Sequence, residues 1–184
     1  MSALIEIQDT VRAIAERVGP AVVGLGRGWG GGSGVVVAPG RVLTSAHNLR
    51  DETTTVTFAD GRAVQGRVHG VDADGDLLVL DVDTADLPAL AFADATPAVG
   101  TVVVALGRGG HRQRATAGFV SGVDHAFAGP RGRQVRGGFE HTAPLARGSS
   151  GGPALDGNGH VLGINTHRVG DGFYLARKIG RAHV

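Results

Sequence analysis

Short apolar runs rich in valine and threonine follow one another along the chain after Pro20. Glycine, proline, aspartate and asparagine separate them, and glycine alone supplies 32 of the 184 residues. Because each interior glycine costs a helix about 1 kcal/mol relative to alanine, this texture disfavours a helical bundle. Many short β-prone runs are typical of an all-β sandwich or barrel. The runs lie at 21–25, 34–38, 42–45, 53–58, 63–71, 77–82, 101–106, 118–123, 161–165 and 172–176.

Two segments depart from this texture. Apolar side chains recur at helical spacing from Leu4 to Val18, and Gly19-Pro20 is a helix stop signal. We therefore predict an N-terminal helix within residues 1–19. Residues 83–100 contain proline and alanine and lack alternation, and we expect them to link two β lobes.

Composition excludes several classes of function. The net charge is +1, with 18 basic against 17 acidic residues, so we expect neither nucleic acid nor a membrane surface as partner. The absence of cysteine excludes disulfides, thiolate nucleophiles and cysteine-based metal sites. The first residues carry early acids and no long apolar run, which predicts no secretory signal, no membrane span and, if Met1 is the true start, a cytoplasmic location.

The most informative motif is Arg147-Gly-Ser-Ser-Gly-Gly-Pro153. A serine between glycines outside a helix is typical of a sharp turn with exposed backbone N–H groups. Acyl transfer requires a hydroxyl that reaches a carbonyl carbon and N–H donors directed at the developing oxyanion. Similar glycine-serine strings also occur in flexible linkers, so the motif alone makes Ser150 a candidate nucleophile and no more.

A histidine and an acidic cluster provide candidate partners for this serine. His47 directly follows an expected strand and is preceded by small residues. Asp72, Asp74 and Asp76 precede a strongly apolar run, and Asp76 abuts it. A buried carboxylate needs a partner, which an imidazole N–H can supply. The alternative for the acids is a hydrated turn. A calcium EF-hand loop is excluded, because its final Glu and flanking helices are missing.

In their order and spacing these motifs resemble the trypsin-like (chymotrypsin-fold) serine proteases, and most closely the bacterial HtrA/Deg branch. The resemblance covers about residues 15–176. It rests on segments 18–23, 32–47, 75–80, 116–122, 148–153 and 163–166.

The resemblance implies an all-β fold of two antiparallel β-barrels with the active site between them. The peptidase domain is expected at residues 20–176, with barrel one at about 20–86 and barrel two at about 97–176. We interpret residues 177–184 as a non-native tail, because they continue neither a strand nor a helix.

The resemblance also implies a catalytic triad. Ser150 would attack the scissile carbonyl, His47 would take its proton, and Asp76 would hold the imidazole tautomer. The backbone N–H groups of Gly148 and Ser150, with help from Ser149, would form the oxyanion hole. The family needs no cofactor and no metal.

The substrate pocket is expected from residues 143–146, 164–167 and 172–174. The predicted substrate-binding residues are Pro144, Leu145, Ala146, Ile164, Asn165, Thr166 and His167. No carboxylate lies in these stretches, although Asp171 is adjacent, so we expect cleavage after small or medium apolar residues. Residues 164–167 are expected to pair with an extended substrate through main-chain hydrogen bonds.

Two residues depart from the family pattern. Ser149 stands where digestive members carry Asp and HtrA members usually carry Asn. Ser149 cannot form an ion pair with a newly cut N-terminus, so we predict no cleavage-dependent activation. Arg147, beside the oxyanion loop, is unusual, and it could reshape or block the hole.

Three other signals receive structural interpretations. Residues 26–31 match a dinucleotide-binding glycine pattern, but a strand follows them instead of a helix, which predicts a loop bordering the cleft. Arginines cluster at 108, 112 and 114 and again at 131, 133 and 136, and we expect both sets in solvated loops. His141 and His167 lack a third ligand at useful spacing, which argues against a metal site.

The leading hypothesis is a serine endopeptidase acting on protein or peptide substrates. The alternative is a catalytically silent member that binds extended peptides in the same cleft, and a basic-loop binding module is a third reading. The HtrA branch further implies a homo-oligomer, a trimer, with contacts through residues 1–18.

Overall fold

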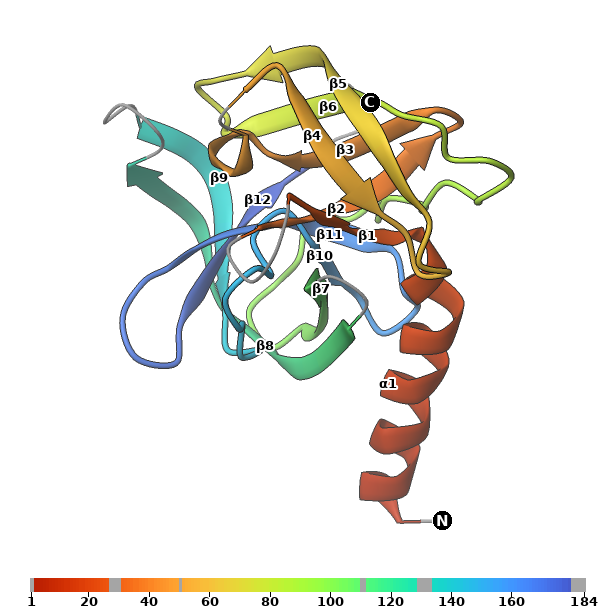
Figure 1. Cartoon of the computed structure of the whole chain (residues 1–184). Coiled ribbons are helices and arrows are strands. Elements are labelled where there is room, and N and C mark those ends of the chain that lie inside the picture. Colours follow the sequence, from red (N-terminus) through yellow and green to blue (C-terminus); the bar gives the residue numbers. More distant parts are fainter. Residues whose placement is uncertain (1, 27–30, 50, 110–111, 129–133, 180–184) are drawn as a thin grey trace.

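The computed structural model describes residues 2–26, 31–49, 51–109, 112–128 and 134–179. Within them the chain forms one long helix, α1 (Ala3–Val18), and two closed antiparallel β-barrels, shown in Figure 1. The prediction of an all-β fold of two barrels with an N-terminal helix is confirmed. Among the described residues, no helix is both long and apolar enough to cross a membrane.

Barrel one closes by pairing its first strand with its fourth, at Gly24↔Thr57 and Leu25↔Val56. Its order is β1-β2-β3-β6-β5-β4. The turn between β4 and β5 uses Gly61 at φ +88°, a conformation that glycine adopts without steric cost. The strands are β1 (Val22–Leu25), β2 (Ser33–Ala38), β3 (Arg41–Ser45), β4 (Thr53–Thr57), β5 (Ala63–Asp72) and β6 (Leu77–Asp81).

Barrel two has the order β10-β11-β12-β9-β8-β7. Its strands are β7 (Val102–Gly109), β8 (Arg112–Ala128), β9 (Gln134–His141), β10 (Pro153–Leu155), β11 (Val161–Arg168) and β12 (Tyr174–Lys178). Two of these, β9 and β10, were not predicted. The first begins in an arginine- and glycine-rich stretch and the second has only three residues, so neither carries a readable alternation.

Three apolar clusters hold the molecule together. One fills barrel one and one fills barrel two. The third lies between the barrels and includes Val35 and Leu43 from barrel one and Leu106 from barrel two. Ile14 and Val18 add the end of α1 to this third cluster, while the start of the helix projects beyond both barrels (Figure 1).

Two expectations need correction. β12 continues past the expected domain end at residue 176, because Lys178 pairs with Gly163, and Ile179 is 2% exposed in the core between the barrels. Residues 180–184 lie outside the described part of the chain.

Arg108, expected in a solvated loop, is only 3% exposed on β7. Its guanidinium donates to the carbonyls of Gly19 and Val22 and to Gln113, and burial lowers its pKa. Arg112, Arg114 and Arg136 are exposed strand residues, and Arg131 and Arg133 lie outside the described residues.

Candidate active site

His47, Asp76 and Ser150 meet where the two barrels face each other. The Oγ atom of Ser150 lies 2.6 Å from His47 Nε2, and His47 Nδ1 lies 2.7 Å from Asp76 Oδ2. The Asp76 side chain is 0% exposed, whereas the His47 side chain is 28% exposed. A hydroxyl, an imidazole and a buried carboxylate therefore form one continuous hydrogen-bonded chain that opens to solvent at the imidazole.

The pairing of β3 with β6 explains why His47 and Asp76 lie together. These strands end at the pair Ser45↔Leu77, so the 3₁₀ turn η3 (Ala46–Asn48) lies beside the turn that precedes β6. Asp76 has φ +55°. Its carboxylate accepts the His47 backbone N–H at 3.0 Å, and its carbonyl accepts the Ala46 N–H at 3.0 Å. The backbone thus fixes the carboxylate against the imidazole.

The turn at residues 148–152 carries the candidate nucleophile Ser150, is called the nucleophile turn below, and uses its glycines for positive φ angles. Gly148 has φ +85° and Gly151 has φ +87°, and side chains other than hydrogen are strained there. The backbone N–H of Gly151 donates to the Asn165 carbonyl at 2.7 Å, and that of Gly152 donates to the Ser149 carbonyl at 3.0 Å. These bonds give the turn a defined shape.

Two backbone donors of this turn remain without a protein acceptor among the described residues: the N–H groups of Gly148 and Ser150. Ser149 does not join them, because its N–H donates to the Ala146 carbonyl at 3.1 Å. The expectation that Ser149 helps to form an oxyanion hole therefore needs correction. Its side chain is 5% exposed and packs against Gly107 of β7.

The predicted substrate-binding residues of β11 divide into two groups. Thr166 adjoins the nucleophile through its carbonyl, which accepts a hydrogen bond from Ser150 Oγ at 2.8 Å. The His167 ring stacks on His47 with centroids 5.0 Å apart. Burial lowers the pKa of His167, and the neighbouring His47 lowers it further.

Ile164 and Asn165 do not face the cleft, which corrects the prediction for these two residues. Ile164 is 0% exposed in the core between the barrels. The Asn165 side chain, also 0% exposed, bonds His141 and the Pro153 carbonyl. These residues are consecutive and therefore lie on opposite faces of β11, and each face is covered there, by the core between the barrels at Ile164 and by His141 at Asn165.

The other predicted wall surrounds a separate cavity. Pro144, Leu145 and Ala146 line a space of about 240 Å³ together with Arg114 and Ser149. Thr116 of β8 also lines this space and donates to the Pro144 carbonyl at 2.7 Å. No residue of 164–167 lines this cavity.

Donor groups of His47, Asp76 and His167 lie within 4.8 Å of one another. Two of them already bond each other, at the 2.7 Å contact between His47 and Asp76. The two imidazole planes are stacked at an angle of 27°, so their in-plane lone pairs run side by side instead of converging on one point. The arrangement is that of a hydrogen-bonded imidazole–carboxylate pair beside a second imidazole, and not that of a tetrahedral metal site.

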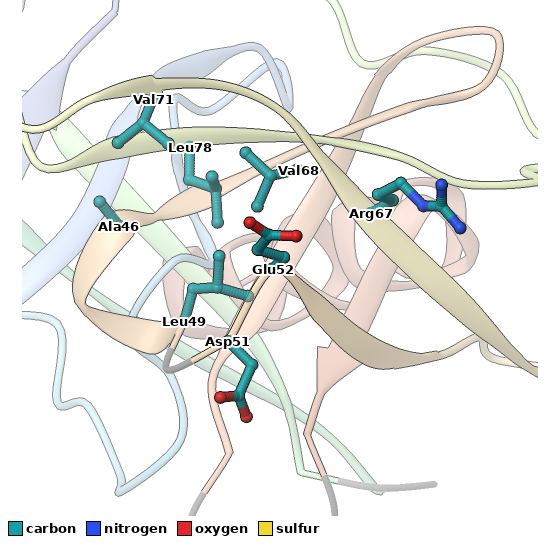
Figure 2. Close-up of a pocket in the computed structure, with 8 residues that line it drawn as sticks. All are labelled: Ala46, Leu49, Asp51, Glu52, Arg67, Val68, Val71 and Leu78. Carbon is teal, nitrogen blue, oxygen red and sulfur yellow. The ribbon is translucent and has the colours of Figure 1, made fainter.

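A larger hollow of about 810 Å³ lies on barrel one, beside Ala46. Figure 2 shows the apolar side chains of Leu49, Val68 and Leu78 facing its interior, with Arg67 directed away. None of the three clustered polar residues, His47, Asp76 and Ser150, lines this hollow, so it is separate from the site.

Sequence reasoning missed the residues that support the site. Ser33 and Asn48 bond the carbonyls of the nucleophile turn, and His141 bonds Asn165. A serine beside glycines and an asparagine directly after His47 carry no signal of such a role in one sequence. The loop predicted at residues 26–31 has its positions 27–30 outside the described residues.

Comparison with known proteins gives a consistent result. A family model for the trypsin-like peptidase domain matches residues 32–164. The chain is 33% identical over 140 residues to serine endoprotease DegS of Escherichia coli, covering 73% of this chain and 39% of DegS. It is 30% identical over 154 residues to chloroplastic Protease Do-like 5 of Arabidopsis thaliana, covering 74% of this chain and 48% of that protein. The chain thus spans less than half the length of these curated relatives.

Among solved structures, the Rv3671c protease of Mycobacterium tuberculosis, in an inactive form, is similar with a TM-score of 0.81. The two chains are 28% identical, and the match covers 93% of this chain and 89% of that one. The resemblance to the HtrA/Deg branch is confirmed by these relatives.

Proposed function

Because the chain belongs to the trypsin-like peptidase family, we propose that it is a serine endopeptidase that hydrolyses peptide bonds of protein substrates. The observation that carries this proposal is the hydrogen-bonded chain from Ser150 Oγ through His47 to the buried carboxylate of Asp76. In this proposal Ser150, His47 and Asp76 are the catalytic residues.

The chemistry follows from the atoms in reach. Ser150 Oγ attacks the scissile carbonyl carbon while its proton passes to His47 Nε2, and the carbonyl oxygen becomes an oxyanion. The N–H groups of Gly148 and Ser150 donate to that oxyanion. His47 then gives the proton to the amine nitrogen as the C–N bond breaks, and water repeats the cycle on the acyl ester. Asp76 holds the Nδ1 proton and stabilises the imidazolium.

An extended peptide is the proposed substrate form. β11 pairs with β10 only as far as Pro153↔Ile164 in the described residues, while β12 covers its other edge. The segment Thr166–Arg168 therefore has one edge open for main-chain pairing with a substrate strand.

We propose that cleavage follows small or medium apolar residues. Asp171, the carboxylate near the expected pocket, is bonded by Arg168 at 2.5 Å and is thereby less able to select a basic side chain. A peptide library profiled by mass spectrometry should show apolar residues before the cut. Dominant cleavage after Lys or Arg would contradict this specificity.

One observation favours the silent alternative, a domain that binds extended peptides without cleaving them. The Ser150 hydroxyl has two acceptors in reach, His47 Nε2 at 2.6 Å and the Thr166 carbonyl at 2.8 Å. A proton held by the carbonyl would leave Oγ unactivated.

A fluorophosphonate probe distinguishes the two functions. We expect the wild-type protein to gain the mass of one phosphonyl group, and Ser150→Ala to gain none while keeping its melting temperature. His47→Ala should slow labelling strongly, because the general base is lost. Folded wild-type protein that binds peptide and stays unlabelled would support the silent alternative.

We also propose that the protein self-associates through α1, as a trimer. The side chains of Leu4, Ile5 and Ile7 are exposed on the projecting part of this helix. Light scattering of the wild type against a triple substitution of these residues with Ser tests the proposal, and a wild-type monomer at high concentration would contradict it.

A further inference from the structure

Side chains of barrel one bond the nucleophile turn, and one of these residues, Ser33, has no role in the proposed function. We propose that Ser33 is a positioning residue for the oxyanion hole, acting through the carbonyl of Gly148. The effect on catalysis that we infer rests on the proposed function, whereas the restraint on the shape of the turn does not depend on it.

Ser33 is fully buried at the start of β2, with 0% exposure. Its Oγ accepts the Arg108 backbone N–H at 2.9 Å and donates to the Gly148 carbonyl at 2.6 Å. The Arg108 carbonyl is a second, more distant acceptor at 3.4 Å. The bond from Arg108 leaves the hydroxyl proton for its nearer acceptor, the Gly148 carbonyl.

This bond fixes the one peptide unit that separates the two proposed oxyanion donors. The unit joins the Gly148 carbonyl to the Ser149 N–H. Ser33 Oγ holds its carbonyl end, and the Ala146 carbonyl accepts its N–H end at 3.1 Å. Because a peptide is planar, holding both ends fixes the rotation of the backbone between the N–H of Gly148 and the N–H of Ser150.

Barrel one also holds a second carbonyl of the turn, that of Ser150. The Ser150 carbonyl accepts the Ser33 backbone N–H at 2.7 Å and the Asn48 side-chain amide at 2.8 Å. Asn48 is in turn within 3.1 Å of Thr44 Oγ1. The clamp, which we define as Ser33, Thr44 and Asn48, therefore bonds two carbonyls of the turn, and Ser33 is the member that reaches Gly148.

Gly151 shows how closely the clamp approaches the nucleophile turn. A Cβ on Gly151 would overlap both the Ser33 carbonyl oxygen and Thr44 Oγ1. Oxyanion stabilisation depends on donors that are held in place before the reaction, and the loss of the Ser33 hydroxyl removes one such restraint.

Amide hydrogen exchange tests the structural part without any need for activity. In the Ser150→Ala background, we expect Ser33→Ala to raise the exchange rate of the Ser149 N–H about tenfold, the factor of one ordinary hydrogen bond. The matched control is Ser45→Ala, which removes a serine of equal burial that bonds the Asn165 carbonyl. Equal Ser149 exchange rates in the Ser33→Ala and Ser45→Ala variants would overturn the proposal.

Steady-state kinetics test whether Ser33 contributes to catalysis. Ser33→Ala should lower kcat about 10- to 100-fold, as expected of misplaced catalytic geometry, with KM nearly unchanged. The affinity for a peptide aldehyde, which forms a tetrahedral adduct, should fall by the same factor. An unchanged kcat, or a loss confined to KM, would overturn the positioning role.

A second variant and a comparison of two measurements distinguish failure of this proposal from misfolding and from failure of the proposed function. If Ser33→Ala does not fold, Ser33→Cys keeps the size of the side chain with a weaker donor, and a smaller change in the same direction is expected. No change in Ser149 exchange with Ser33→Cys overturns the proposal in that case. If Ser149 exchange responds but fluorophosphonate never labels the wild type, the proposed peptidase function fails while the restraint on the turn stands.

Discussion

Two regions of the proposed active site differ in how firmly the fold holds them. At the end that holds the proposed triad, called the catalytic end here, the carboxylate of Asp76 is fully buried, and the carbonyls of Gly148 and Ser150 accept hydrogen bonds from barrel one. Residues 144–147 and 172–174, the stretches that we propose to read the substrate, are called the recognition end here, and in them Pro144, Ala146 and Arg147 are exposed. The longest of its bonds, from Arg114 to the Arg147 carbonyl, measures 3.5 Å.

We infer from this difference that the firmly held end serves the chemistry and the more exposed end serves substrate selectivity. Reacting atoms must be held to within a fraction of an ångström, because a misplacement of about 1 Å can cost about 100-fold in rate. A surface that reads substrate side chains carries no such requirement. Substitutions at the catalytic end should therefore be severe, and those at the recognition end mild.

The largest effect is expected from Asp76→Asn. The amide keeps the size of the side chain but favours the wrong imidazole tautomer, and kcat should fall about 10⁴-fold, as in other enzymes of this chemistry. Steady-state kinetics of peptide cleavage measure it, and the melting temperature serves as control. A decrease of less than tenfold in folded protein would show that the buried carboxylate is not part of the chemistry.

Gly151→Ala should be the most destabilising change in the turn. The backbone strain at φ +87° costs about 1–2 kcal/mol, and overlap with the backbone of Ser33 adds about 1–3 kcal/mol. Urea unfolding should therefore give a loss of about 2–5 kcal/mol, the sum of the two costs.

Gly172→Ala is the matched control at the recognition end. It has the same φ of +87°, but nothing lies within 4 Å of the place that a Cβ would occupy. We expect a loss of about 1–2 kcal/mol from strain alone. Equal losses at Gly151 and Gly172 would remove the distinction between the two ends.

His141 provides a pH-dependent test, because it supports β11 below the catalytic end. It is 0% exposed, its Nε2 lies 3.0 Å from Asn165 Oδ1, and its Nδ1 has no partner among the described residues. Burial lowers its pKa from 6.5 to about 4, against smaller opposing effects of Asn165 and Glu140. The unfolded chain therefore binds a proton at higher pH than the folded chain does.

The direction of the pH effect on stability follows because the pKa of His141 is lower in the folded than in the unfolded chain. The contribution of His141 is complete above pH 6.5 and is lost as the pH falls towards 4, by at most about 3 kcal/mol. Urea unfolding at several pH values should show a flatter acid decline in His141→Gln than in the wild type. Identical declines would show that His141 binds its proton equally well in the folded and the unfolded chain.

The catalytic end was also the more predictable from sequence. The structure brings His47, Asp76 and Ser150 together, as the family resemblance implied, whereas each motif alone left its residue a candidate. Ile164 and Asn165 were placed in the pocket, yet both are buried, because β11 is covered on both faces at this point and the local sequence does not show which faces are covered.

Long-range bonds explain the rest of what sequence could not predict. Ser33 lies 115 residues from the carbonyl it bonds, and Arg108 is buried only because carbonyls near the end of α1 accept its protons. A residue's own neighbours contain no information on such partners. Sequence motifs thus indicate the candidate residues of the site, whereas the residues that support them are recognised only in the folded barrels.

The smallest effect is expected from Arg147→Ala, at the recognition end. Its side chain is exposed, and its carbonyl, which Arg114 contacts, is retained in the variant. Stability should change by no more than about 0.5 kcal/mol, as for most surface substitutions, and fluorophosphonate labelling should keep its rate. Arg114→Ala is the paired variant, since it removes the 3.5 Å contact itself. A labelling rate that rises at least tenfold in Arg147→Ala would instead mean that this arginine obstructs the oxyanion hole, and the recognition end would then control the chemistry.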